Sequence, residues 1–150
     1  LALLVGLHTA LRRGDALRLS WSAYDGQAIQ TLTAKRNVWL WIPCNSELRA
    51  ALDATRRRCP TILTTAAGRP WKLDHFGHAF QAAVEAAGLS GVSFHGLRAT
   101  FAARAAGDLT DAEIESILGN TMARHYRRNA SQKTLAEGAI AKLERRKNKQ

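Results

Sequence analysis

The chain has 150 residues, 46% of them hydrophobic, which is enough for a single domain with its own core. Its 22 lysine and arginine residues against 12 acidic ones give a net charge of +10, far from the balance of an ordinary cytosolic enzyme. This charge indicates a polyanionic partner, nucleic acid rather than a membrane surface. The two cysteines, Cys44 and Cys59, have no neighbours at metal-ligand spacing and cannot make a disulfide scaffold, so we expect a reducing environment, no metal and no cofactor.

The N-terminal segment is apolar, but it is too short to span a bilayer and has no basic region before it. It therefore predicts neither a membrane helix nor a signal peptide, and we expect a cytoplasmic protein with no membrane partner. Leu3, Leu7 and Leu11 recur every four residues and predict a helix stripe that runs up to Gly14. Because this helix begins at the first residue and without a methionine, we expect the chain to be a fragment of a longer protein.

The next segment predicts a short helix and then a hairpin. Asp15 can cap the short helix, after the break at Gly14. Residues 27–33 and 38–42 favour two strands joined by a short loop, which makes a small antiparallel sheet. Both faces of the second strand are apolar, because its tryptophans alternate with aliphatic residues, so at least one face should be covered.

Further helices are predicted after the hairpin from apolar periodicity and from residues that start or stop a helix. They give a mainly α fold with a small antiparallel β-sheet, an α+β class. A basic tail at about 145–150 is expected to be disordered. The predicted helices are 46–58, one from a cap at Asp74 to Gly88, one that opens with His95 and breaks at Gly107, one from the Thr110 capping box to Gly119, and 131–146.

The helix that opens with His95 carries the residues most suited to chemistry. His95 and Arg98 are three positions apart, so both side chains should emerge on one exposed face. Leu97, Phe101 and Ala105 recur on a neighbouring face that should be buried. One face of this helix is thus predicted to pack, and the other to be available to a ligand.

Three motifs together resemble a known family. His95-x-x-Arg98, the following helix, its Leu-Gly stop and then Tyr126 among basic residues resemble the second conserved box of the tyrosine recombinases, the phage-integrase and Xer family. The segment HTALRRGDALRLSW resembles the first box of that family, and AKRNVWLWIP resembles its lysine-bearing hairpin. The order and spacing of these motifs over nearly the whole chain are hard to obtain by chance.

The resemblance implies that residues 1–150 adopt the catalytic-core fold of the DNA breaking-rejoining enzymes, without the separate N-terminal core-binding domain of the family. It implies metal-free cleavage and rejoining of DNA through a covalent 3′-phosphotyrosyl intermediate at Tyr126. The partners would be double-stranded DNA and other protomers in a tetrameric synapse, joined through the C-terminal helix. A bacterial or phage-derived, nucleoid-associated recombinase or integrase is therefore expected, with a type IB topoisomerase as an enzymatic neighbour.

The remaining catalytic roles follow from matching the family's motifs. Arg12 and Arg98 would hold the non-bridging oxygens of the phosphate, since a guanidinium can donate two parallel hydrogen bonds. His95 would hydrogen-bond the phosphate or take the tyrosine proton, and Lys35 would protonate the departing 5′ hydroxyl. Asp15 would support the fold around the site. Further contacts to phosphates are expected from Arg13, Arg36, Arg124, Arg127 and Arg128.

The segment before the tyrosine departs from the family pattern. Asn120 stands where family members place His or Trp, and asparagine cannot act as an acid or base. The interval from Gly119 to Tyr126 is also shorter than usual. A degenerate recombinase that binds DNA without cutting it is therefore one alternative. A non-catalytic helix-turn-helix module, with 110–118 as its recognition helix, is another, although that helix is acidic.

Overall fold

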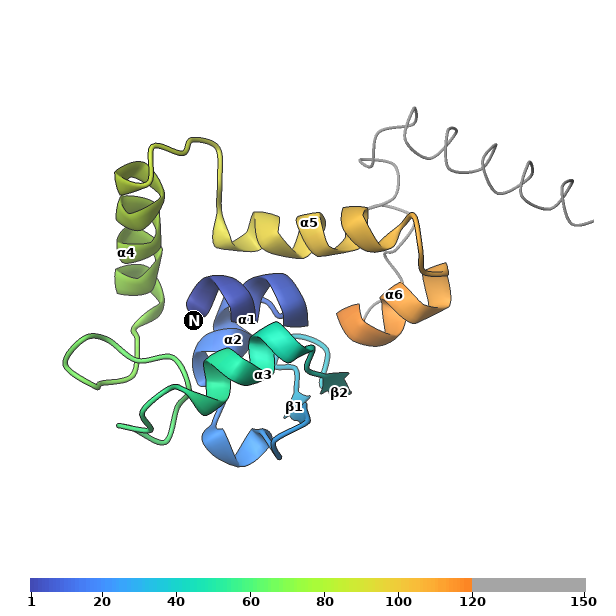
Figure 1. Ribbon diagram of the computed structural model, residues 1–150, viewed down its shortest axis with the longest axis horizontal. Coiled ribbons are helices and arrows are strands. Elements are labelled where there is room, and N and C mark those ends of the chain that lie inside the picture. Colours follow the sequence, from blue (N-terminus) through green and yellow to red (C-terminus); the bar gives the residue numbers. More distant parts are fainter. Residues whose placement is uncertain (120–150) are drawn as a thin grey trace, which may run out of the picture.

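A computed structural model describes residues 1–119, which form helices around a two-stranded antiparallel sheet (Figure 1). The predicted fold class is confirmed. No helix in this part of the chain is long and apolar enough to cross a membrane. The elements are α1 (Ala2–Thr9), α2 (Arg13–Arg18), the 3-10 helix η1 (Trp21–Ala23), β1 (Ala28–Leu32), β2 (Trp39–Pro43), α3 (Ser46–Asp53), α4 (Leu73–Ala86), α5 (Phe94–Ala105) and α6 (Asp111–Leu118).

The first helix ends earlier than predicted. α1 stops at Thr9, because Ala10 takes a left-handed conformation with φ 51°. The Thr9 hydroxyl accepts a hydrogen bond from the Leu11 amide, which supports the turn in place of another helical residue. α2 then begins at Arg13, so Gly14 and Asp15 lie inside it rather than breaking and capping it.

The predicted leucine stripe of α1 is also wrong. Leu3 is 52% exposed, whereas Val5 and Gly6 face the interior. A Cβ added at Gly6 would lie 2.7 Å from Leu97 Cδ1, so the absence of a side chain lets α1 approach α5 closely. The contact with α5, and not the leucine spacing alone, therefore decides which face of α1 is buried.

The hairpin is confirmed, and it is covered on one face. β1 and β2 pair with Ile29 opposite Ile42 and Leu32 opposite Trp39. Leu40 and Ile42 are buried, but Trp39 and Trp41 are 66% and 63% exposed. Residues 34–38 of the loop between the strands are exposed, whereas Thr33 is buried.

The later helices follow the sequence signals more closely at their starts than at their ends. The Asn45 side chain caps α3 by accepting a hydrogen bond from the Leu48 amide. α3 ends at Asp53 and not at residue 58 as predicted. α4 begins at Leu73, so Asp74 lies in its first turn and is not its cap. The predicted capping box of α6 is present in both halves, and Gly119 ends this helix in a left-handed conformation.

The core has two parts, and α5 contributes to both. The larger part includes Val5 of α1, Ile42 of β2 and Leu48 of α3, all buried. An aromatic group extends this part toward α4, with the Phe76 and Phe94 ring centroids 5.2 Å apart. The smaller part joins α5 to α6 and consists of Ala10, Ala102, Ala106, Ile114 and Leu118.

Candidate active site

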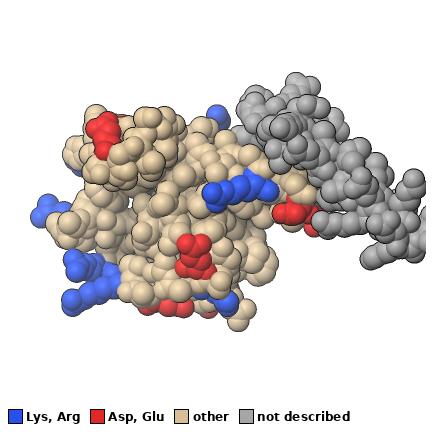
Figure 2. All heavy atoms as spheres, turned by 45° about the horizontal axis from the view of Figure 1, so that its top comes forward, with Lys and Arg blue, Asp and Glu red and all other residues tan. Residues whose placement is uncertain are grey.

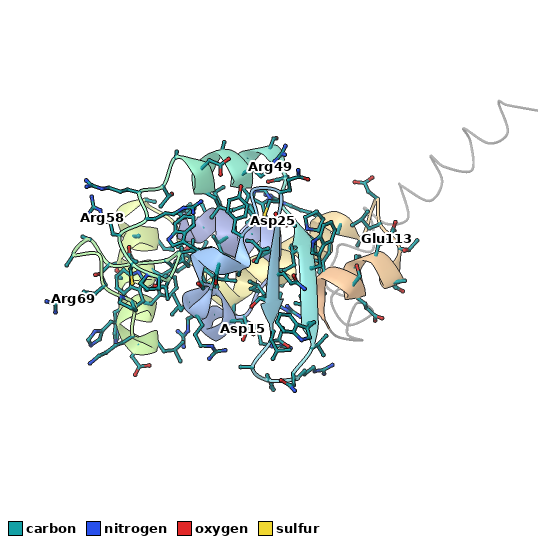
Figure 3. All side chains as sticks on the ribbon, turned by 90° about the horizontal axis from the view of Figure 1, so that it is seen from below. Asp15, Asp25, Arg49, Arg58, Arg69 and Glu113 are labelled. Carbon is teal, nitrogen blue, oxygen red and sulfur yellow. The ribbon has the colours of Figure 1, made fainter. Side chains whose placement is uncertain are left out.

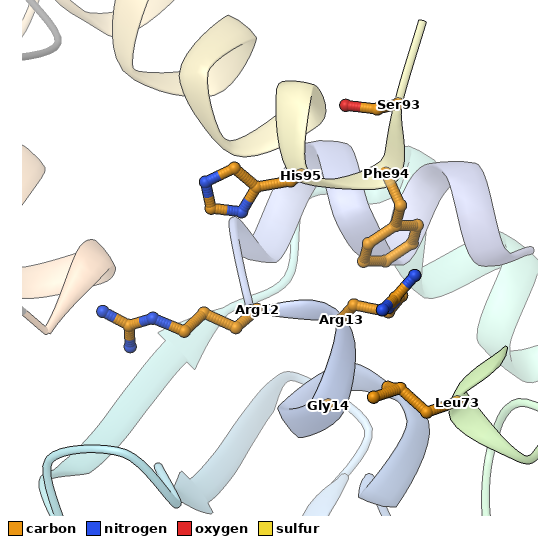
Figure 4. A pocket seen from close by; sticks show the side chains of 7 residues that line it. All are labelled: Arg12, Arg13, Gly14, Leu73, Ser93, Phe94 and His95. Carbon is orange, nitrogen blue, oxygen red and sulfur yellow. The ribbon is translucent and has the colours of Figure 1, made fainter. Parts of the chain in front are cut away.

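The start of α2 and the start of α5 meet at a pocket of about 440 Å³ (Figure 4). Two of the predicted catalytic residues, Arg12 and His95, line it. Arg12 stands at the N-cap of α2 in an extended conformation, two residues after the left-handed Ala10. The Ser93 hydroxyl caps α5 by accepting a hydrogen bond from the Gly96 amide at 3.0 Å. The full lining is Arg12, Arg13, Gly14, Leu73, Ser93, Phe94 and His95.

Arg12 and His95 lie on the same side of this pocket in Figure 4. Within residues 1–119, ion pairs join His8 with Glu47 and Arg18 with Asp15, and neither the Arg12 nor the His95 side chain makes a hydrogen bond or ion pair. His95 is exposed and Arg12 is partly exposed. Their nitrogen atoms are therefore available to an anionic ligand, as guanidinium and imidazole groups at a phosphate site must be.

Arg98 does not share the exposed face of His95, which corrects the sequence prediction. It is 2% exposed and belongs to the buried stripe of α5 with Phe94, Leu97 and Ala102. Its Nη1 donates to the Ala10 carbonyl at 2.6 Å, and its Nη2 donates to the Leu118 carbonyl at 2.8 Å.

The carbonyls that Arg98 meets lie at helix ends. Ala10 is the C-cap of α1 and Leu118 is the last residue of α6, and such carbonyls have no partner within their own helix. Because the side chain satisfies both at once, these hydrogen bonds offset part of the cost of burying its charge. Arg98 therefore fixes the backbone two residues before Arg12.

Asp15 joins α2 to the hairpin. Its carboxylate is buried, with 5% exposure, and Oδ1 accepts hydrogen bonds from Arg18 Nη2 at 2.7 Å and from the Ala34 amide at 3.0 Å. Ala34 directly precedes Lys35 in the loop of the hairpin. These contacts suit the supporting role predicted for Asp15, because they hold the lysine-bearing loop against the helix that follows Arg12.

Lys35 and Arg36 are exposed on this loop, and neither lines the pocket of Arg12 and His95 as the structure describes it. Arg36 lies instead at a second pocket, of about 390 Å³, between β2 and the end of α6. A Cβ added at Gly119 would lie 2.8 Å from Leu40 Cδ2, so the chain leaves α6 directly against β2. The lining of this second pocket is Arg36, Val38, Trp39, Leu40, Glu115, Ser116 and Gly119.

Several predicted site residues lie outside the described part of the chain, and their roles stay predictions. They are Asn120, Arg124, Tyr126, Arg127 and Arg128, together with the predicted helix at 131–146. The other tyrosine of the chain, Tyr24, is buried away from the pocket lining. Its hydroxyl lies 3.1 Å from both Asp53 Oδ1 and the Gly26 carbonyl. Burial, and then the hydrogen bond to Asp53, raise the pKa of Tyr24 above its ordinary value, which makes this phenol a poor nucleophile.

The sequence prediction missed Ser93, Leu73 and Phe94 as part of the site. A signal existed for Ser93, since serine three residues before Gly96 at the start of a periodic segment is typical of an N-cap. Leu73 and Phe94 gave no such signal, because only the packing of α4 against α2 and α5 brings them to the pocket.

Charge is unevenly distributed over the surface. Figure 2, which brings the side with α4 and α5 forward, shows several basic side chains at its left end, and scattered basic and acidic side chains on an otherwise uncharged surface. Arg58 and Arg69 lie at the same end of the molecule in Figure 3, on the segments after α3 and before α4. Arg57 lies over the Trp21 ring, 4.8 Å from its centroid. This basic end adds to the electrostatic attraction of a polyanion.

Comparison with solved structures defines the fold class. A lambda integrase (residues 75–356) dimer bound to a core site has a TM-score of 0.73 at 24% identity, covering 87% of this chain and 52% of that one. XerA recombinase has a TM-score of 0.73 at 18% identity, covering 89% and 53%. The Tn1549 transposon integrase in complex with transposon right end DNA has a TM-score of 0.73 at 18% identity, covering 96% and 57%. The fold is that of a tyrosine recombinase catalytic core.

The family model described as the phage integrase family matches residues 1–133. The chain belongs to the phage integrase family. It spans about half the length of the lambda integrase and XerA chains that it matches, 52% and 53%. A comparison with curated protein sequences finds no match.

Proposed function

We propose that this chain is the catalytic domain of a site-specific DNA recombinase that cleaves and rejoins DNA through Tyr126. The observation that carries the proposal is the pocket at which Arg12 and His95 present nitrogen atoms without partners among residues 1–119. A basic chain with a net charge of +10 supports a phosphate ligand at this pocket. Membership of the phage integrase family supports the reaction class.

The proposed reaction transfers one phosphoryl bond. The Tyr126 oxygen attacks the scissile phosphorus, a bond forms between them, and the bond from phosphorus to the 5′ oxygen breaks. The tyrosine proton passes to His95 or to the phosphate that His95 binds, and Lys35 gives a proton to the departing 5′ oxygen. The resulting phosphotyrosine keeps the energy of the broken bond, so a 5′ hydroxyl can reverse the step and rejoin the strand.

Two arginines would balance the charge that develops on the phosphate. Arg12 reaches the phosphate from the edge of the pocket, where its guanidinium has no competing carboxylate among residues 1–119. Arg98 would act from the interior through its positive charge, because it is 2% exposed and its Nη1 and Nη2 already donate to two carbonyls. Donors that are fixed in place before the reaction need no reorganisation when charge develops, and losing one such donor typically costs about 3 to 4 kcal/mol of the barrier.

Assembly on DNA belongs to the same proposal. The predicted C-terminal helix would dock on its own or a neighbouring protomer, and four protomers would form the synapse. The lambda integrase and Tn1549 integrase structures contain DNA, and a lambda integrase tetramer is bound to a Holliday junction. Those assemblies support double-stranded DNA as the substrate class of this chain, with binding mainly through phosphates and steeply dependent on salt.

The helix-turn-helix alternative is weaker. On α6, Ala112, Glu113 and Ser116 are exposed, while Ile114 and Leu118 are buried in the core. Glu113 is engaged in the capping box, and Thr110 donates to it through its amide and its hydroxyl. A helix that presents acidic groups repels the phosphates on both sides of a groove. A DNA-binding role without cleavage therefore depends on Asn120 and not on α6.

The test is covalent capture in the presence of EDTA. A nicked suicide duplex, drawn from a random pool of sequences, is incubated with the protein, and an adduct that resists SDS is sought on a gel. Tyr126→Phe should abolish the adduct, whereas Tyr24→Phe, the matched control on the other tyrosine, should keep it. An adduct that survives Tyr126→Phe rejects the assigned nucleophile, and no adduct together with tight DNA binding favours the degenerate recombinase.

A further inference from the structure

Arg12 and Arg13 are neighbours in the chain, but their side chains enter different parts of the pocket. In Figure 4 the Arg12 guanidinium extends to the side on which His95 lies, whereas that of Arg13 lies between Phe94 and Leu73. Both arginines are partly exposed. The pocket therefore presents two separate guanidinium groups, one on the side of His95 and one on the side of α4.

The position of Arg13 depends on a glycine of α4. A Cβ added at Gly77 would lie 3.0 Å from Arg13 Nη1, closer than almost all real contacts of this kind. Gly77 is in the interior of α4, where glycine is a poorer helix former than alanine. The guanidinium of Arg13 thus lies against the backbone of α4, and a side chain at residue 77 would require it to shift by a few tenths of an ångström.

Arg13 also lacks a counter-charge. Among residues 1–119 the ion pairs are His8 with Glu47 and Arg18 with Asp15, and Arg13 takes part in neither. No hydrogen bond in this part of the chain involves its side chain. A partly exposed guanidinium without a protein partner keeps its donors available to an anionic ligand. The lining of the pocket contains no carboxylate that could occupy them.

We propose that Arg13 binds a second phosphate of the DNA strand, next to the phosphate that Arg12 and His95 hold, and that Gly77 leaves the space in which Arg13 takes this position. The inference rests on the proposed function in taking DNA as the ligand. It assigns Gly77, which touches no reacting atom, as a positioning residue. A planar guanidinium that can donate two parallel hydrogen bonds suits a phosphate diester on a strand that passes along α4.

The test measures DNA affinity as a function of salt, with the full chain carrying Tyr126→Phe so that binding is separated from cleavage. Fluorescence anisotropy with a labelled random-sequence duplex gives the slope of log affinity against log salt. Arg13→Ala should make this slope shallower by about 0.9, the contribution of one phosphate contact, and should weaken binding roughly fivefold to tenfold near physiological salt. Arg49→Ala is the control for charge alone, since Arg49 lies on α3, far from Asp15 in Figure 3.

Gly77→Ala tests the position of Arg13 without removing its charge. It should weaken binding and lower the slope less than Arg13→Ala does, because the guanidinium is shifted and not removed, while the Tm stays the same or rises, because alanine favours the helix. The double variant should bind like Arg13→Ala alone, since the second change has nothing left to displace. Gly107→Ala is the matched glycine control, because a Cβ there meets nothing within 4 Å.

The outcomes separate this inference from the proposed function. If the parent protein binds DNA but Arg13→Ala leaves the salt slope unchanged, the second phosphate contact is overturned and the recombinase proposal stays intact. The same conclusion follows if the losses of affinity from Arg13→Ala and Gly77→Ala multiply independently in the double variant. The same holds if Arg49→Ala changes the slope as much as Arg13→Ala. No salt-dependent binding by the parent protein overturns both.

Discussion

The carboxylate of Asp15 accepts a hydrogen bond from the backbone amide of Ala34, at 3.0 Å and across 19 residues of sequence. This bond ties the helix that follows Arg12 to the residue that precedes Lys35. The segments that carry two residues predicted to act on one phosphate are therefore linked through a single buried acceptor. Four predictions follow from this and similar contacts.

Asp15→Ala should lower both stability and the rate of adduct formation. It leaves the Ala34 amide and the Arg18 guanidinium without their acceptor, at a cost of about 1 to 3 kcal/mol in the free energy of unfolding. Urea denaturation measures the first effect, and the suicide-duplex assay measures the second. Asp15→Asn, which keeps an acceptor oxygen, should lose less of both. Equal adduct rates for Asp15→Ala and the parent would separate Asp15 from the site.

Arg98→Met should destabilise the domain by about 3 kcal/mol or more. The change removes two charge-assisted hydrogen bonds and leaves the carbonyls of Ala10 and Leu118 without these donors. Amide hydrogen exchange should accelerate in α6, whose last turn loses its contact with α5. Arg104→Met, an exposed position on the same helix, should change stability by no more than about 0.5 kcal/mol. Similar urea midpoints for the two variants would contradict this account of Arg98.

Gly6→Ala and Gly14→Ala should have opposite effects on stability. A Cβ at Gly6 would lie 2.7 Å from Leu97 Cδ1 and 3.0 Å from the Phe94 ring, so these side chains or the helices must shift, at about 1 to 3 kcal/mol. A Cβ at Gly14 would meet only Arg18 Nη1 at 3.9 Å, so the gain in helix propensity, about 1 kcal/mol, should dominate. Thermal unfolding should give a lower Tm for Gly6→Ala and a higher Tm for Gly14→Ala than for the parent. A higher Tm for Gly6→Ala would refute the close contact between α1 and α5.

Tyr24→Phe should change the alkaline limit of stability. The pKa of Tyr24 is raised in the folded protein, first by burial and then by Asp53, above its ordinary value of 10.0. A raised folded-state pKa means that the stabilisation is fully present below about pH 10 and is lost as the pH rises through the folded-state value. Tyr24→Phe should thus unfold less readily than the parent above pH 10, relative to neutral pH. If the free energy of unfolding of the two proteins changes in parallel from pH 7 to 11, the raised pKa of Tyr24 is contradicted.

The sequence predicted features that depend on local signals. The hairpin alternates along β2 between buried aliphatic residues and exposed tryptophans, and the Thr110 capping box is present as its four-residue pattern requires. The end of α1 could not be predicted, because the left-handed Ala10 is held by a contact with Arg98, 88 residues later. Arginine usually lies at the surface, so its burial depended on two helix ends whose positions the sequence did not reveal.

In the site, too, residues with local sequence signals could be predicted, whereas those placed by contacts between distant segments could not. Arg12 and His95 were predicted together, and the structure brings them to one pocket because the start of α2 packs near the start of α5. The contribution of Gly77 could not be predicted, because a glycine inside a helix pattern gives no indication of which side chain lies against it. Only the crossing of α2 and α4 identifies Arg13 as that side chain.

The bond from Arg98 to the Ala10 carbonyl also sets an order for folding during synthesis. The ribosome releases α1 before α5, and the partners of α1 on α5 are made some 88 residues later. The chain must close this long loop before Gly6 meets Leu97 and before the turn ahead of Arg12 is fixed. A nascent chain therefore carries the arginine of its first motif without a site around it, and it gains the pocket only when α5 has left the ribosome.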